Sequence, residues 1–141
     1  MKLSEHFTLG ELTKTNYVTK DGNFPSRVAI ENLTNICENW LEALRQAQGP
    51  LIINSGYRSP EVNKFAGGSS TSNHLTGCAV DIRVAGFEQA VRYASILLDI
   101  SDGTKRDYDE LFIEKNKTGS HWIHFAVKPK DNRRKSGFIK V

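Results

Sequence analysis

The sequence predicts an α+β fold: a single small domain in which helices pack on one face of a mainly antiparallel sheet. Its 141 residues are about enough for one domain, and no repeat or Pro/Gly/Ser linker divides them. Two long segments place apolar residues at helical spacing, and several short segments are uniformly apolar or alternate, as strands do. The last two strand-like segments are joined by a turn that contains glycine, which favours a hairpin. Helices and hairpins segregated in this way indicate α+β architecture.

The composition is typical of a folded protein without membrane segments. The chain is 38% hydrophobic and 25% charged, which disfavours long-range disorder, and no apolar run approaches the ~20 residues of a membrane-spanning helix. The first residues lack the apolar core of a secretory signal, so we expect synthesis in the cytoplasm without a signal peptide. A net charge of +3 is too mild to demand an anionic partner. We expect a monomer, with neither nucleic acid nor membrane as its partner.

The N-terminal third begins with an arm and continues into a long helix. Residues 1–25 are polar with scattered aromatic and leucine side chains, which predicts an irregular arm with a short helix that starts near Thr8 or Gly10. Ser26 is suited to cap the next helix, and Gly49 with the following proline ends it. The apolar residues of this helix recur at helical spacing: Val28, Leu33, Ile36, Trp40, Leu41 and Leu44.

The middle of the chain mixes strands and helices. Residues 51–53 predict a short buried strand, and Pro60 can open a helix that runs to about residue 65. Residues 67–73 are a loop by composition, and residues 78–84 predict a second strand. An amphipathic helix is expected from Phe87 to about residue 100.

The C-terminal third contains the expected hairpin and a basic end. Residues 108–114 and 122–127 predict two strands, joined by a turn over 115–120. Residues 128–141 form a basic C-terminal segment, which is typical of a solvated tail. Contact of this segment with anionic cell wall is a weaker hypothesis.

Two of the predicted strands carry metal-binding side chains on the face that points away from the core. Alternation puts Asp81 on the polar face of its strand, beside the small Ala79. It likewise puts His124 on the polar face of its strand, beside Ala126. If the two strands are neighbours, Asp81 and His124 converge on one open patch.

A third metal-binding side chain lies just upstream of the first of these strands. His74 belongs to a loop beyond which Gly77 permits a tight approach. Two imidazoles and one carboxylate suit Zn²⁺, which keeps an open fourth position when it is catalytic. Such a position can hold the water that hydrolysis requires, because the metal lowers the pKa of that water.

The same residues carry a resemblance to a known family. The segment from Ser72 to Asp81 matches the signature S-x-H-x-x-G-x-A-x-D of the M15 family of zinc peptidases, which the chain resembles over nearly its whole length. Upstream, the run S-G-Y-R-S from Ser55 is similar to the segment that precedes this signature. Downstream, the run H-W-I-H from His121 occupies the place of the second histidine motif. The compact chain most resembles the small phage and prophage branch.

The resemblance implies a role for each of these residues. His74, Asp81 and His124 would be the zinc ligands, and Ser72 would hold the His74 loop or contact substrate. Arg58 would stabilise the negative charge that develops on the scissile carbonyl oxygen. Two aromatic residues beside these motifs are candidates for substrate contact: Tyr57 and Trp122.

The general base has two candidates. Many members of the family carry Glu or Asp three residues before the last ligand, and here that position is His121. An imidazole can transfer protons at neutral pH, but residues three apart on a regular strand point to opposite faces. His121 therefore reaches the zinc only if it lies in the turn before the strand. Glu114, at the end of the preceding strand, is the other candidate.

These features predict a zinc-dependent peptidoglycan peptidase that hydrolyses a bond in the stem peptide. The resemblance implies a D-Ala-D-Ala carboxypeptidase or an L-Ala-D-Glu endopeptidase that acts at the bacterial cell wall, reached by lysis, a holin or a phage particle. The alternative is a non-catalytic, zinc-containing cell-wall-binding module on the same scaffold, which the histidine in place of an acidic base favours. The hypothesis of a nucleic-acid-binding domain is supported only by the basic tail and is the least favoured of the three.

Overall fold

The chain folds into one five-stranded sheet with helices packed against it. The computed structural model describes the whole chain, residues 1–141. The elements in chain order are α1 (Leu9–Thr13), α2 (Arg27–Ile36), the π-helical turn η1 (Cys37–Leu41), α3 (Glu42–Gln48), β1 (Ile53–Ser55), α4 (Pro60–Phe65), the 3₁₀ turn η2 (Asn73–Thr76), β2 (Ala79–Arg83), α5 (Phe87–Thr104), β3 (Glu110–Lys115), β4 (His121–Ala126) and β5 (Lys135–Lys140). The strand order is β1-β2-β4-β3-β5, and all pairs are antiparallel except β3 with β5. No helix is both long and apolar enough to span a membrane.

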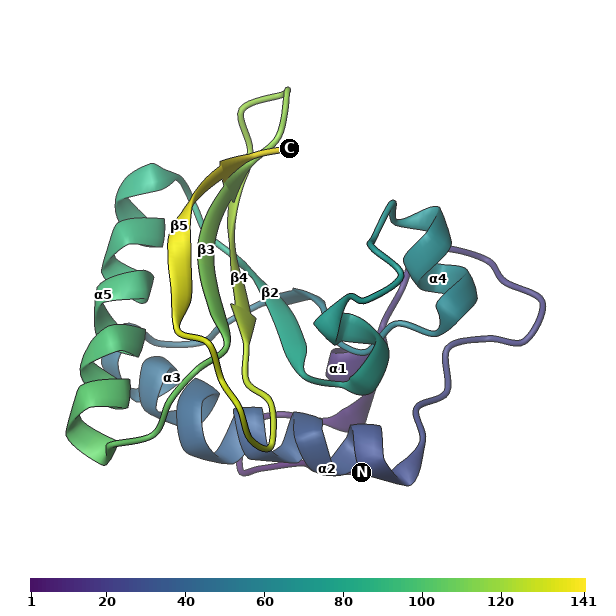
Figure 1. Ribbon diagram of the computed structural model, residues 1–141, viewed down its shortest axis with the longest axis horizontal. Helices are drawn as coiled ribbons and strands as arrows, with labels where there is room; N and C mark the ends of the chain where they lie inside the picture. The colour runs from purple at the N-terminus through teal and green to yellow at the C-terminus, as the bar shows by residue number, and fades with distance from the viewer.

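One face of the sheet forms the core. In Figure 1, α5 runs alongside the strands, and the continuous helix made by α2, η1 and α3 passes beneath them. Alternation directs Val80 and Ile82 of β2, and Ile123 and Phe125 of β4, to the buried face, where none of the four is exposed. The ring of Trp40 in η1 packs edge-on against Phe125, with centroids 5.0 Å apart. The α+β prediction and the predicted core faces of both strands are confirmed.

The opposite face of the sheet remains available for a functional site. In Figure 1, α4 and the turn η2 stand across from β2, on the side of the sheet away from α5. The turn η2 contacts α2, α4 and β2, so it is anchored to both the helical layer and the sheet. The polar side chains of β2, β3 and β4 point into the space between these elements. Candidate functional residues are therefore concentrated there.

Several elements have bounds that differ from the sequence-based expectation, β1 and α5 among them. β1 begins at Ile53, two residues later than expected, and its pairing with β2 is irregular. α5 continues to Thr104, beyond the end expected near residue 100, and the residue that caps it, Lys105, has a left-handed φ of 58°. Ser101 explains part of this extension, because it is buried and its hydroxyl donates a hydrogen bond to the carbonyl oxygen of Arg106.

The C-terminal segment is not the solvated tail that the sequence suggested. Residues 135–140 form β5, which pairs in parallel with β3 over its whole length. β5 is an edge strand, and most of its side chains are exposed. Its polar composition therefore resembles that of a tail, since backbone pairing holds it to the sheet and few of its side chains are buried.

Candidate metal centre

The register of the sheet brings the two strand donors together. β2 and β4 are antiparallel neighbours, and Asp81 lies directly opposite His124. The next pair on the same face is Ala79 with Ala126, whose small side chains leave room beside the donors. His124 Nδ1 lies 3.0 Å from Asp81 Oδ1. The predicted convergence of Asp81 and His124 is thus observed.

A capped turn supplies the third donor. The Ser72 hydroxyl accepts a hydrogen bond from the N–H of His74 at 3.2 Å, and Gly77 ends the turn in the left-handed conformation, with φ of 72°. Gly77 also approaches α2 so closely that a Cβ there would lie 2.3 Å from the carbonyl oxygen of Ala29. The turn directs the buried His74 ring toward the sheet, where Nε2 lies 3.4 Å from Asp81 Oδ1.

The loop after β1 orients the His74 ring. The N–H of Arg58 donates to the carbonyl oxygen of His74 at 3.0 Å, and His74 Nδ1 donates to the carbonyl oxygen of Gly56 at 2.7 Å. Only glycine fits at position 56, because a Cβ would lie 2.3 Å from the carbonyl oxygen of Leu12. Since Nδ1 carries the proton, the lone pair of Nε2 faces Asp81 and is available to a cation.

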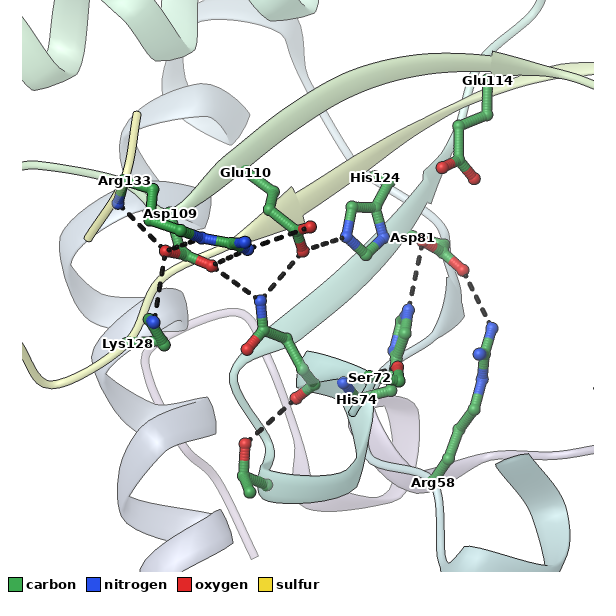
Figure 2. A network of polar contacts seen from close by, with 12 residues as sticks. Arg58, Ser72, His74, Asp81, Asp109, Glu110, Glu114, His124, Lys128 and Arg133 are labelled. Atoms are coloured by element: carbon green, nitrogen blue, oxygen red, sulfur yellow. Dashed lines mark hydrogen bonds and ion pairs between the residues drawn. The ribbon is translucent and has the colours of Figure 1, made fainter. Parts of the chain in front are cut away.

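The three donors fit a zinc ion. One ligand atom from each of His74, Asp81 and His124 lies within 4.8 Å of the other two. Figure 2 shows the three side chains converging from η2, β2 and β4. Two imidazole nitrogens and a carboxylate oxygen are zinc ligands, and three protein ligands leave a fourth position for water or substrate. This donor set is typical of a catalytic zinc site.

The electrostatics of the cluster favour positive charge. Burial raises the pKa of Asp81, but the adjacent imidazoles of His74 and His124 lower it further, so the pKa lies below the ordinary value and the carboxyl is ionised. Burial lowers the pKa of His124, but hydrogen bonds to Asp81 and Glu110 raise it to about 10. A place that stabilises an imidazolium this strongly also stabilises a bound cation.

Arg58 is held rigidly beside the cluster. One terminal nitrogen of its guanidinium lies 3.2 Å from Asp81 Oδ2, and Nε donates to the Ser55 hydroxyl at 3.0 Å. The Ser59 hydroxyl caps α4 and so ends the loop that carries Arg58. Because the side chain is 15% exposed and its orientation is set by these bonds, it presents a fixed positive charge to the cleft.

Glu114 lies in the same cleft. A cavity of about 720 Å³ is lined by Glu114, by Arg58 and by all three donors. Glu114 lies opposite Trp122 across β3 and β4, and the indole Nε1 donates to its Oε1 at 2.8 Å. In Figure 2 the Glu114 side chain extends from β3 on the Asp81 side of the cluster. Burial raises the pKa of Glu114 above its ordinary value, which suits a proton acceptor near neutral pH.

Comparison with known proteins agrees with this geometry. The family model described as Peptidase M15 matches residues 5–109. The chain belongs to the M15 peptidase family. It is also 35% identical over 80 residues to the zinc D-Ala-D-Ala carboxypeptidase of Streptomyces albus G, in a match that covers 55% of this chain and 31% of that protein. The chain thus spans about a third of the length of this curated relative.

Membership of the M15 family confirms the predicted resemblance. The zinc cofactor predicted for this M15 peptidase is also confirmed, by the converging donor set together with the zinc relative. The family match ends at residue 109, before the hairpin of β3 and β4. The sheet register is therefore what connects Glu114 and His124 of the hairpin to His74 and Asp81 of the matched region.

His121 lies on the opposite face of the sheet from the metal donors. As the first residue of β4, it pairs with Lys115 and points away from His124. Its ring contacts Phe87 of α5 and Phe138 of β5, with centroids 5.8 and 6.4 Å away. Strand alternation accounts for this placement, because residues three apart face opposite ways. The geometry gives no support to His121 as the base of this M15 peptidase.

Tyr57 and Trp122, the two predicted substrate contacts, differ in their surroundings. Tyr57 is 9% exposed and packs in the hydrophobic core, so the geometry gives no support to its contact with substrate. Arg58 follows Tyr57 directly, and the loop turns the Arg58 side chain toward Asp81 and the Tyr57 ring inward. Trp122 does line the cleft, on the same face as His124.

Four polar residues of the site were not predicted from the sequence. Glu110 accepts a hydrogen bond from His124 Nε2 at 2.9 Å. It also accepts one from an asparagine amide and pairs with an arginine, and both of these residues bind a buried aspartate. The other three members are Asp109, Asn73 and Arg133. Asp109 and Glu110 stand together at the start of β3, and adjacent acids before an apolar strand were the only sequence signal for this group.

Proposed function

We propose that this M15 peptidase is a zinc-dependent enzyme that hydrolyses a bond in the stem peptide of peptidoglycan. The observation that carries the proposal is the convergence of His74, Asp81 and His124 in a cleft that also holds Glu114 and Arg58. Family membership supports peptide hydrolysis, and the relative's name supports a D-amino-acid-containing peptide as the substrate. Each of the five side chains is already oriented by a partner in the fold.

The residues around the donors divide the work of hydrolysis. Zinc held by the three donors supplies a Lewis acid that polarises a carbonyl group and lowers the pKa of a coordinated water. Glu114 accepts a proton from the attacking water and delivers it to the leaving amine as the C–N bond breaks. Its raised pKa makes the carboxyl able to take and return this proton. Arg58 donates hydrogen bonds to the carbonyl oxygen as that oxygen gains negative charge.

The cleft offers room for the peptide beside the donors. Trp122 and Arg58 line the large cavity and also an adjoining one of about 430 Å³, which the N-terminal arm closes with Lys14 and Tyr17. We propose that the stem peptide lies along these joined cavities, with its scissile bond next to Asp81. Ser72 serves to hold the His74 turn, because its hydroxyl is already used as the cap of η2.

Mass spectrometry of defined muropeptides tests the proposal. The zinc-loaded protein, a chelator-treated sample and the Glu114→Gln variant would be incubated with the same substrates. We expect hydrolysis by the zinc-loaded protein only. Loss of a terminal D-alanine would identify a carboxypeptidase, and cleavage between L-alanine and D-glutamate would identify an endopeptidase. Intact substrates, with zinc verified in the protein, would overturn the proposal in favour of a non-catalytic wall-binding module.

A further inference from the structure

Glu110 makes one of the two side-chain hydrogen bonds of the His124 ring, and Asp81 makes the other. Its Oε1 lies 2.9 Å from His124 Nε2, and its side chain is 19% exposed. The position follows from the fold, because Glu110, Phe112 and Glu114 alternate onto the site face of β3. The Phe112 ring stacks on the His124 ring with centroids 5.9 Å apart and an interplanar angle of 13°, so ring tilt is restricted as well.

We propose that Glu110 is a positioning residue that makes Nδ1, and not Nε2, the metal-binding nitrogen of His124. An ionised carboxylate can only accept hydrogen bonds, so the Nε2 that faces it carries the proton. Nδ1 lies 3.0 Å from the Asp81 carboxylate, on the side of the other two donors, so the proton that a bound zinc ion replaces is the one on Nδ1. Without Glu110 the neutral ring is free to exchange tautomers or to turn over.

Glu110 is itself held by a buried polar network. The side-chain amide of Asn73 donates to Glu110 Oε1 and to Asp109 Oδ2, at 2.9 Å each. Asp109 is fully buried, and Arg133 donates to both of its oxygens. The same Arg133 guanidinium lies 3.3 Å from Glu110 Oε2. In Figure 2 dashed contacts connect Arg133 with Asp109 and Glu110, and Glu110 with His124.

This network makes the C-terminal segment part of the metal centre. Arg133 lies just before β5, in the segment that the sequence suggested to be a solvated tail. Asn73 immediately precedes His74, so one set of hydrogen bonds connects the supports of two ligands. His74 has a matching arrangement, in which the Gly56 carbonyl fixes the proton on Nδ1. Oxygen acceptors behind metal-binding imidazoles set ring orientation and strengthen metal binding.

Zinc affinity, measured by competition with a chromophoric chelator, tests the proposal without reference to peptidase activity. We expect Glu110→Ala to weaken zinc binding by about 10–100-fold, the usual loss when such a partner is removed. Glu110→Gln keeps an oxygen acceptor of the same length, so it should lose much less affinity. Circular dichroism of each metal-free variant would show that the fold is retained.

Two adjacent arginines provide a matched pair. Arg133→Ala removes the support of Asp109 and Glu110 and should weaken zinc binding. Arg134→Ala is the control, because Arg134 fastens the same segment to Ser101 and Asp107 and has no contact with Glu110. If both variants weaken zinc binding equally, the segment acts only by tethering and the proposal is overturned.

Nitrogen-15 NMR of the histidine rings reports the tautomer itself. In the zinc-loaded protein we expect a protonated Nε2 on His124, and in zinc-loaded Glu110→Ala a mixture of rings bound through Nδ1 and through Nε2. Unchanged zinc affinity in Glu110→Ala, or a His124 ring bound to zinc through Nε2 in the unmodified protein, would overturn the proposal. If zinc affinity and the His124 tautomer behave as expected but the protein hydrolyses no peptide, the result counts against the proposed function and not against the role of Glu110.

Discussion

At the scale of single residues, the site is organised around one buried carboxylate. Asp81 is approached by the imidazoles of His74 and His124 and by the guanidinium of Arg58. Each of these groups is held from behind by an oxygen acceptor: the Gly56 carbonyl, the Glu110 carboxylate or the Ser55 hydroxyl. The functional geometry therefore exists in the fold itself, and removal of single side chains should have separable effects.

The first residue-scale prediction concerns the ligands. His74→Ala and His124→Ala should each abolish tight zinc binding, because a site with three protein ligands rarely tolerates the loss of one. His121→Ala is the matched control, since it lies on the same strand as His124 but on the other face. Metal analysis after gel filtration would measure zinc per chain. Full zinc occupancy in either ligand variant would contradict the assignment.

The second residue-scale prediction separates the two candidate bases. Glu114→Gln should keep its zinc but lose about 10²–10⁴-fold in kcat, the usual contribution of a general base. His121→Ala should keep both zinc and kcat. Steady-state hydrolysis of a muropeptide measures the two rates. The opposite outcome, a fast Glu114→Gln and a slow His121→Ala, would restore His121 as the base.

At the scale of elements, short connections place the donors. The turn η2 carries His74 and is fixed by its Ser72 cap and by the close contact of Gly77 with α2. On the other side of the site, the segment just before β5 carries Arg133, which pairs with the buried Asp109 at 2.8 Å. Both connections are short polar segments outside the core, so their energetic importance is best shown by substitutions with matched controls.

Gly77→Ala and Gly67→Ala test the turn η2. Both glycines have left-handed φ values, 72° and 76°, so alanine costs about 1–2 kcal/mol at either position. Only at Gly77 would the added Cβ also collide, at 2.3 Å from the carbonyl oxygen of Ala29, whereas nothing lies within 4 Å at Gly67. Urea unfolding should therefore show a larger loss of stability for Gly77→Ala. Equal losses of stability would show that the turn shifts to accommodate the added Cβ at position 77.

Asp109→Asn tests the attachment of the C-terminal segment through its pH dependence. Burial raises the pKa of Asp109, but hydrogen bonds from Arg133 and Asn73 lower it below its ordinary value. A carboxyl with a depressed pKa stabilises the fold above its unfolded pKa, about 3.9, and loses this contribution as the pH falls toward the folded value. We expect the variant to be about 1–3 kcal/mol less stable at pH 7, and the difference to shrink below pH 4.

Asp102→Asn is the control for this pH series. Its carboxylate is 74% exposed and pairs with Arg134 at 3.6 Å, so it should change stability little at any pH. Chemical unfolding at several pH values gives both curves. A stability difference for Asp109→Asn that persists unchanged at low pH would show that shape, and not charge, explains the effect.

At the scale of the whole molecule, the sequence predicted local patterns well and long-range pairing less well. Alternation placed Asp81 and His124 on the open face, and Ser26 and Pro60 marked the starts of α2 and α4 near their observed bounds. Alternation also indicated that His121 and His124 point to opposite faces of the sheet. All three inferences depend on neighbours in the chain, which a sequence displays directly.

The features that the sequence did not reveal depend on contacts between distant segments. β5 is an exposed edge strand whose partner lies twenty-five residues upstream, as in the pairing of Glu110 with Lys135, and its composition alone resembles a tail. The role of Glu110 appears only when β3 pairs with β4 and sets it beside His124. Tyr57 resembles a cleft residue because it precedes Arg58, and only the packed core shows which way its ring turns.

Diffraction from crystals of the zinc-loaded protein, recorded at the zinc absorption edge, tests the central claim most directly. We predict one anomalous peak, about 2.0–2.2 Å from His74 Nε2, an Asp81 carboxylate oxygen and His124 Nδ1. The Glu114 carboxylate should face the same cleft. A zinc ion bound elsewhere on the chain, with these three side chains unliganded, would contradict the account.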